Sequence, residues 1–172
     1  MLEHALSYPT CSTRGPRACV DVPTLSKLAL RIAAKHWSAH LKKRINVVGA
    51  VLTRGQTILA ARRSSEMSLP GLWEFPGGKI ELNESPEQAL LRELEEELLC
   101  SADIGQHVET TEHEYDFGIV ILTTFYCSLV GAEPRLTEHS EIRWVQATEL
   151  DQLDWAPADI PAVERVMKDF RV

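Results

Sequence analysis

Residues 85 to 98 are the segment that most restricts how this chain can fold, because the start and the buried face of a helix can both be read from it. Ser85 can cap the helix, Pro86 suits its first position, and Gln88 completes a capping box. Its apolar residues recur at helical spacing: Ala89, Leu90, Leu94 and Leu98. The segment therefore predicts an amphipathic helix that ends near Leu98 and packs its apolar face on a core.

The same helix carries four carboxylates in five positions, Glu93, Glu95, Glu96 and Glu97. Like charges three or four residues apart on a helix repel by a few tenths of a kcal/mol per pair. Glu93, Glu96 and Glu97 share one side of the helix, whereas Glu95 points away. A hard divalent cation such as Mg²⁺ would turn this repulsion into coordination. The alternative is a solvated acidic face, partly balanced by an ion pair between Arg92 and Glu96.

Short runs rich in valine, isoleucine and leucine surround this helix and are typical of strands. The runs at 45–53 and 57–61, joined across Arg54-Gly55-Gln56, predict a hairpin. Further strands are expected at 72–75, 106–117, 119–129 and 142–146, and a closing helix at 161–170. Few strands alternate with helices, so this order favours an α+β fold, a sheet between helices, over a doubly wound parallel sheet.

The first 44 residues differ from the rest in charge, with a net charge of +6 against −13 for the remainder. Residues 1–23 have three prolines and no periodicity, which predicts an irregular or disordered extension. Residues 24–44 predict a basic amphipathic helix. This helix could be a docking helix, an appendage from an upstream start codon, or an organelle-targeting or membrane-surface segment. Residues 45–172 are expected to form one domain.

Composition excludes several classes of protein. The chain has 172 residues and no apolar run near the roughly 20 residues that a membrane span needs. Its four cysteines show no CxxC spacing, which favours reduced thiols and a cytoplasmic location. An acidic body does not suit direct nucleic-acid binding, so a protein of this kind that handles phosphates needs a cation. A monomer and a homodimer both remain open.

The segment GKIELNESPEQALLRELEEELLC, residues 78–100, resembles the nudix box of the MutT-type pyrophosphohydrolases. The matching positions are Gly78, Glu84, Arg92, Glu93, Leu94, Glu96 and Glu97. One position departs from the pattern, because Leu99 stands where the family has a glycine. A left-handed conformation at Leu99 would cost roughly 1 kcal/mol relative to glycine.

The resemblance extends from about residue 45 to the C-terminus and implies the nudix fold, a mixed β-sheet sandwiched between α-helices. It implies a Mg²⁺ cofactor, with Mn²⁺ possible, held by the carboxylates of the helix and by one carbonyl. The implied ligands are Gly77, Glu93, Glu96, Glu97 and the more distant Glu138, with Glu141 as the alternative to Glu138. Either Glu93 or Glu138 would act as the general base, and Arg92 would orient the glutamates.

The resemblance also suggests substrate contacts. Arg63 and Lys79 would touch phosphate, with Arg62 as the alternative if the strand register shifts by one residue. Asp159, in Pro157-Ala158-Asp159, would read the base; an ionised carboxylate there accepts hydrogen bonds only. The alternative for Asp159 is a helix N-cap.

Aromatic residues are candidates for the wall of a base pocket. Phe75 and Tyr115 are the first choices and Trp73 and Trp155 the alternatives, although aromatics at strand positions are more often part of the core. The expected reaction is Mg²⁺-dependent hydrolysis of a (deoxy)nucleoside triphosphate to the monophosphate and pyrophosphate. Cytosine, 5-methylcytosine and oxidised purine nucleotides such as 8-oxo-dGTP are the expected substrates, in nucleotide-pool sanitation. A hydrolase of ADP-ribose-like diphosphates and a non-catalytic binding module are the alternatives.

Overall fold

The computed structural model describes residues 42–171 of the chain. Its strands are β1 (Arg44–Arg54), β2 (Thr57–Arg62), β3 (Trp73–Glu74), β4 (Ser101–Tyr115), β5 (Gly118–Val130) and β6 (Glu141–Gln146). Its helices are α2 (Pro86–Leu98), the short 3-10 helix η1 (Ala147–Gln152) and α3 (Ile160–Asp169). In this part of the chain no helix is long and apolar enough to cross a membrane.

The strands form one mixed sheet in the order β3-β2-β1-β5-β4, with β6 paired to β2. The central pair, β1 and β5, is parallel, and the other pairs are antiparallel. The β1–β2 hairpin turns at Gly55, where φ is +59°. The observed sheet confirms the expected hairpin and the mixed α+β fold.

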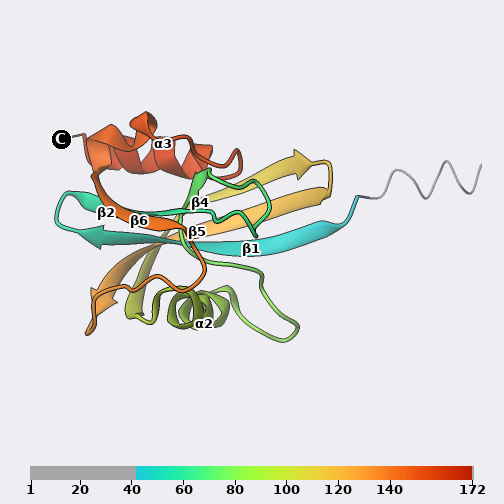
Figure 1. The fold of residues 1–172 in the computed structure, drawn as a ribbon, viewed down its shortest axis with the longest axis horizontal. Coiled ribbons are helices and arrows are strands. Elements are labelled where there is room, and N and C mark those ends of the chain that lie inside the picture. Colours follow the sequence, from blue (N-terminus) through green and yellow to red (C-terminus); the bar gives the residue numbers. More distant parts are fainter. Residues whose placement is uncertain (1–41, 172) are drawn as a thin grey trace, which may run out of the picture. The chain divides into compact units, whose positions relative to one another are not determined.

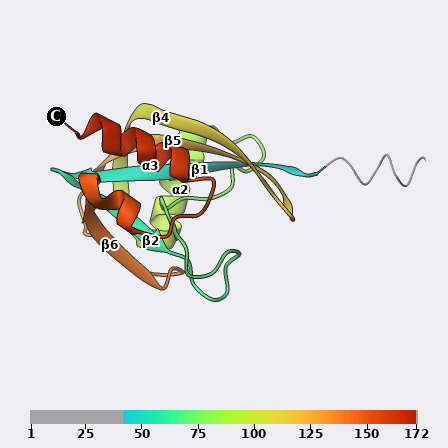
Figure 2. The same ribbon diagram turned by 90° about the horizontal axis from the view of Figure 1, so that it is seen from above.

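The sheet lies between α2 on one face and α3 on the other (Figure 1). Successive residues of β1 point to opposite faces, as the two-residue period of a strand requires. Leu52 packs with Leu90 and Leu94 of α2, whereas Val51 packs with Val163 and Val166 of α3. Viewed from above, α3 lies over β1 and the β4–β5 side of the sheet (Figure 2).

Helix α2 begins as expected. The Gln88 N–H donates to the Ser85 hydroxyl at 3.2 Å, and the Ser85 N–H donates to the Gln88 side chain at 2.9 Å. Leu99 ends the helix in the left-handed conformation, with φ of 49°. The residue that departs from the family pattern thus keeps the backbone geometry that glycine would supply.

The structure differs from the expected elements in three places. Strand β4 begins at Ser101 rather than at residue 106, because register shifts between Ile104 and Glu109 interrupt its alternation. Helix η1 was not expected. Most of the helix expected over residues 24–44 lies outside the described residues, but its last part is wrong, because residues 42 and 43 are not helical and Arg44 begins β1.

Candidate active site

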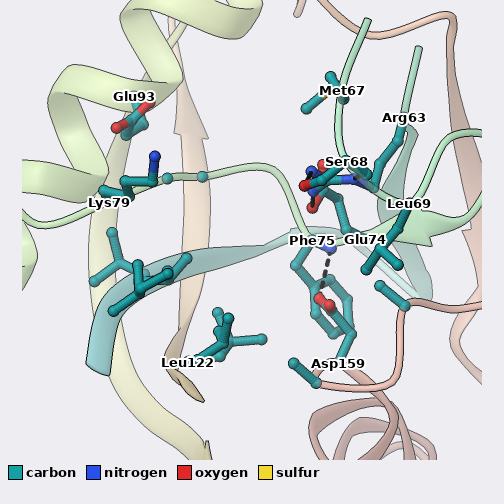
Figure 3. A pocket seen from close by; sticks show the side chains of 18 of the residues that line it. Arg63, Met67, Ser68, Leu69, Glu74, Phe75, Lys79, Glu93, Leu122 and Asp159 are labelled. Carbon is teal, nitrogen blue, oxygen red and sulfur yellow. Dashed lines mark hydrogen bonds and ion pairs between the residues drawn. The ribbon is translucent and has the colours of Figure 1, made fainter. Parts of the chain in front are cut away.

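A cavity of about 440 Å³ opens between α2, the segment 63–81, the β4–β5 hairpin and the segment 156–159. Figure 3 shows Lys79 and Glu93 on one side of it and Glu74 and Asp159 on the other, with Leu122 between them. We call the first side the carboxylate end and the second side the base end. The cavity therefore joins the predicted metal-binding helix to the predicted base-reading loop.

Arg92 is hydrogen-bonded to three glutamates at the carboxylate end. Its Nη1 donates to Glu93 at 2.9 Å and to Glu96 at 3.1 Å. Its Nε and Nη2 donate to the two oxygens of Glu84 at 2.9 and 3.0 Å, and Nη2 also reaches the Lys79 carbonyl at 3.0 Å. These bonds raise the pKa of Arg92 and lower that of Glu84. A bidentate guanidinium of this kind fixes carboxylate rotamers.

Glu97 is the most buried of the helix glutamates, with 5 % of its surface exposed. It accepts a hydrogen bond from the Gly77 N–H at 3.0 Å. Burial raises the pKa of Glu97 to about 8, although the charge of His139 acts to lower this pKa. Burial also raises the pKa of Glu93. Both carboxylates would gain from a cation that stabilises their ionised forms.

The glycines before the helix are required by close packing. A Cβ on Gly77, whose φ is +151°, would lie 2.2 Å from the Val48 carbonyl oxygen. A Cβ on Gly78 would lie 2.3 Å from the carboxyl carbon of Glu93. The carbonyls of Pro76 and Gly78 accept hydrogen bonds from β1, whereas that of Gly77, between them, is outside this ladder. The Gly77 carbonyl is thus available as the predicted ligand.

The donor set of the carboxylate end consists of oxygen atoms, which suits a hard divalent cation. Among residues 42–171, no three acidic, histidine or cysteine side chains converge as a complete metal site. A cation such as Mg²⁺ usually binds through one or two carboxylates together with waters and substrate phosphates. The residues therefore fit a cation that is held jointly by protein and substrate.

Glu138 lies on the exposed loop between β5 and β6 and is not among the residues that line the cavity. Its charge contributes to the raised pKa of Glu93, so the two carboxylates are neighbours. The alternative, Glu141, is ion-paired with Arg143 at 2.5 Å and lies 3.7 Å from Arg62. The ion pairs of Glu141 leave Glu138 as the less engaged of the two carboxylates.

Asp159 lines the base end and is buried. Its Oδ1 accepts a hydrogen bond from the Phe75 N–H at 3.0 Å, and its side chain makes no capping bond to α3. The helix N-cap alternative is therefore wrong for its side chain. Burial, and secondarily the charge of Glu74, raise the pKa of Asp159 well above its usual value.

The aromatic candidates divide into wall and core. Phe75 lines the cavity and packs against Trp155 with ring centroids 4.8 Å apart, whereas Trp155 also donates its indole N–H to the Leu150 carbonyl. Tyr115 lines the cavity, and its hydroxyl accepts a hydrogen bond from the Ala158 N–H at 3.0 Å. Neither Trp73 nor Trp155 is among the residues that line the cavity.

The sequence did not single out Phe117, which stacks on Tyr115 with ring centroids 4.9 Å apart and planes 7° from parallel. Phe117 lines the cavity and is 51 % exposed. The sequence feature that could have pointed to Phe117 is its place beside Gly118, at the tip of a predicted hairpin. A side chain at such a tip has no neighbouring strand to bury it. The stack adds an accessible aromatic surface to the cavity.

Arg63 and Lys79 both line the cavity but differ in their surroundings. The Arg63 guanidinium is ion-paired with Glu74 at the base end and also donates to the carbonyl and hydroxyl of Ser68. Lys79 lies beside Glu93 (Figure 3). The alternative, Arg62, donates to the Gly71 carbonyl and does not line the cavity.

A buried pair at the base end was also missed. His139 Nε2 lies 2.9 Å from Glu74 Oε1, and both residues are buried. Burial would lower the pKa of His139, but Glu74 and Glu97 outweigh it and raise this pKa. This pair could not be read from the sequence, because the two residues are 65 positions apart.

Known proteins are similar to this chain in sequence and in fold. The family model described as NUDIX domain matches residues 43–166. CTP pyrophosphohydrolase of Escherichia coli (strain K12) is 39% identical over 125 residues, which cover 73% of this chain and 93% of that protein. 8-oxo-dGTP diphosphatase of the same strain is 30% identical over 128 residues, covering 74% of this chain and 99% of that protein.

A solved structure gives the same result. The solution structure of a MutT protein of the nudix hydrolase family, from methicillin-resistant Staphylococcus aureus 252, is 56% identical to this chain. The TM-score is 0.64, with 75% of this chain and 99% of that chain covered. Nudix hydrolases generally use divalent metal cations and act on nucleotide substrates. The match to the family model and the identity to its relatives show that this chain belongs to the nudix hydrolase family.

Proposed function

We propose that the protein is a Mg²⁺-dependent pyrophosphohydrolase, also able to use Mn²⁺, that converts a (deoxy)nucleoside triphosphate to the monophosphate and pyrophosphate. The observation that carries this proposal is the single cavity that joins the carboxylate end to the base end. Because Glu93 and Asp159 both line this cavity, a bound nucleotide would place its phosphates near Glu93 and its base near Asp159. Its substrates would be cytosine nucleotides, including 5-methyl-dCTP, or oxidised nucleotides such as 8-oxo-dGTP, because relatives bear the names CTP pyrophosphohydrolase and 8-oxo-dGTP diphosphatase.

The carboxylate end would hold the cation and its phosphates. The proposed ligands are the Gly77 carbonyl and the carboxylates of Glu93, Glu96, Glu97 and Glu138. When bound, the cation would neutralise phosphate charge and make water a better nucleophile. Lys79, beside Glu93, would bind a phosphate oxygen.

The proton of the attacking water would pass to Glu93 or to Glu138. Glu93 is held by the Arg92 Nη1 at 2.9 Å, which fixes its orientation. Glu138 is exposed and is free to approach a bound substrate. The general base must be ionised to accept the proton, so the variant, Glu93→Gln or Glu138→Gln, that removes the low-pH limb of the pH–rate profile would identify the base.

The base end would select the nucleobase. Phe75, Tyr115 and Phe117 provide apolar walls, and Asp159 provides the polar contact. Because Oδ1 of Asp159 accepts from the Phe75 N–H, Oδ2 would meet the base. The raised pKa of Asp159 favours a neutral carboxyl group, which donates as well as accepts. A neutral Asp159 would therefore also bind a base whose edge carries a hydrogen-bond acceptor beside a donor. An ionised Asp159 would bind only bases that present donors.

Arg63 would contribute to the base end rather than to phosphate binding, because its guanidinium is held by Glu74 and Ser68. A phosphate contact would require Arg63 to leave the buried Glu74 carboxylate, which is costly. Loss of the Arg63 side chain should therefore alter base selectivity more than Mg²⁺ dependence.

Substrate choice can be measured with a panel of nucleotides. We expect kcat/KM for dCTP, 5-methyl-dCTP or 8-oxo-dGTP to exceed that for ADP-ribose, with turnover only when Mg²⁺ or Mn²⁺ is present. A preference for ADP-ribose would contradict the triphosphate assignment. No turnover of any compound would favour a binding module. The proposed setting is nucleotide-pool sanitation in the cytoplasm, by a monomer or a homodimer.

A further inference from the structure

The loop between β5 and β6 is fixed to the rest of the domain on both sides of Glu138. Thr137 is bonded to the end of α2, His139 to Glu74, and Ser140 to the Arg62 carbonyl. Glu138 itself is exposed. The segment 137–140 therefore presents one free carboxylate from a backbone that is anchored at three neighbouring positions.

Thr137 makes the contact that is closest to the carboxylate end. Its hydroxyl lies 2.8 Å from the Glu96 carbonyl oxygen and 2.6 Å from the Glu97 carbonyl oxygen, and its N–H donates to the Glu97 carbonyl at 3.2 Å. The Arg135 N–H donates to the Leu98 carbonyl at 2.7 Å. The last carbonyls of a helix have no partner within the helix, so these bonds come from the loop.

The carbonyls that Thr137 binds belong to the residues whose side chains form the carboxylate end. Glu138 directly follows Thr137, so a shift of the loop along α2 would move Glu138 relative to the glutamates of this helix. The helix end is also closed by Leu99 in the left-handed conformation, with N–H bonds to Glu95 and Leu94, and by the N–H groups of Cys100 and Arg135. The Thr137 hydroxyl, which reaches two helix carbonyls, thus contributes to the register between the loop and the helix.

We propose that Thr137 is a positioning residue, which holds the Glu138 carboxylate in place to act on the cation bound at the carboxylate end. This inference rests on the proposed function, in which Glu138 is a ligand or a base. Thr137 touches neither the substrate nor the cation in this scheme. Its effect passes through Glu138.

The test uses the full chain with four variants: Thr137→Val, Thr137→Ser, Glu138→Gln and the double variant Thr137→Val/Glu138→Gln. Valine keeps the shape of threonine and removes the hydroxyl, whereas serine keeps the hydroxyl. Thr53→Val is the matched control, because the Thr53 hydroxyl donates to the Cys127 carbonyl at 3.2 Å, and Thr53 is absent from the cavity lining. Binding of Mn²⁺, followed by electron paramagnetic resonance without nucleotide, and the Mg²⁺ dependence of turnover are measured for each protein.

We expect Thr137→Val to weaken Mn²⁺ binding and to raise the half-saturating Mg²⁺ concentration about fivefold, the effect of one lost hydrogen bond. Thr137→Ser and Thr53→Val should behave like the unmodified protein. In the Glu138→Gln background, Thr137→Val should add no further loss, because its effect passes through Glu138. If Thr137→Val does not fold, Thr137→Ala replaces it in the same comparisons.

Two results separate the inference from the proposed function. If Glu138→Gln leaves the metal dependence unchanged, the role of Glu138 in the proposed function fails, and this inference fails with it. If Glu138→Gln weakens metal binding but Thr137→Val does not, or if the losses add in the double variant, only the positioning role of Thr137 is overturned. A lower melting temperature of Thr137→Val with unchanged Mn²⁺ binding also overturns it, because that result indicates a purely structural bond.

Discussion

The two ends of the cavity are assembled in different ways. The carboxylate end comes mainly from one helix, where Glu93, Glu96 and Glu97 lie within five positions, and from the loop just before it. The base end combines Glu74, Tyr115 and Asp159, which lie on separate parts of the chain. Local spacing therefore determines the first end, whereas tertiary packing determines the second.

This difference separates general chemistry from selectivity. In the proposed function, the carboxylate end would handle phosphates, which are the same in every nucleotide, so a fixed helical spacing would suffice. The base end would match one base among several, and its contacts could change one segment at a time without disturbing the helix. Variants of the carboxylate end should thus affect all substrates alike, and variants of the base end should affect substrates unequally.

The largest effect is expected for Glu97→Gln at the carboxylate end. The substitution keeps the shape of the side chain and can keep the bond from the Gly77 N–H, but it removes a charge that the cation needs. The rate kcat should fall about a hundredfold or more for every triphosphate. Glu95→Gln, on the exposed side of the same helix, is the control and should keep full activity. An unchanged rate of Glu97→Gln would refute its role in metal binding.

The pH dependence of stability should also report on Glu97. Its pKa is raised by burial to about 8, above that of an unfolded chain, so the folded protein is favoured when Glu97 is protonated. In EDTA, the contribution of Glu97 is fully present below about pH 4.3, the pKa of an unfolded glutamate, and is lost as the pH rises through 8.

This loss can be measured by urea denaturation at pH 5 and pH 9. We expect the free energy of unfolding to fall by about 4 kcal/mol more in the unmodified protein than in Glu97→Gln. The difference between the two proteins isolates Glu97 from other titrating groups. Equal pH dependence in both proteins would show that Glu97 is not held in an environment that opposes its charge.

At the base end, Asp159→Asn should change selectivity rather than catalysis. The amide always offers a donor and an acceptor, whereas the carboxyl group depends on its protonation. The ratio of kcat/KM for dCTP to that for 8-oxo-dGTP should shift about tenfold. Asp151→Asn, on the exposed side of η1, is the control. A uniform loss for both substrates would place Asp159 in folding or catalysis instead.

The smallest effect is expected for Phe117→Ala. Loss of an exposed stacking surface should raise KM about threefold and leave kcat nearly unchanged, because the aromatic ring binds the nucleotide without touching the reacting atoms. Phe117→Leu should be intermediate. Val130→Ala, at the far end of β5 and similarly exposed, should have no effect. A loss of kcat with unchanged KM would argue against a binding role.

The same contrast between local and distant contacts explains which features could be predicted from the sequence. The capping box at Ser85, the glutamate cluster and the role of Arg92 all follow from spacing along one helix, and the structure bears out this local geometry. The hairpin between β1 and β2 is equally local. Leu99 shows that the local conformation persists even where the expected glycine is absent.

The features that could not be predicted from the sequence depend on contacts between distant segments. The pairing of His139 with Glu74, and the ion pair that draws Arg63 toward the base end, join residues from separate strands and loops. The anchoring of Thr137 to Glu96 and Glu97 spans about 40 positions. The start of β4 was misplaced because register shifts break the alternation on which strand prediction depends.

The most direct test of the central claim is to quantify both products of dCTP, 5-methyl-dCTP and 8-oxo-dGTP hydrolysis, with Mg²⁺ and with EDTA. We predict equal amounts of the nucleoside monophosphate and pyrophosphate from the preferred triphosphate in Mg²⁺, and no reaction in EDTA or with Glu97→Gln. Turnover in EDTA, or release of orthophosphate in place of pyrophosphate, would contradict a cation-dependent pyrophosphohydrolase.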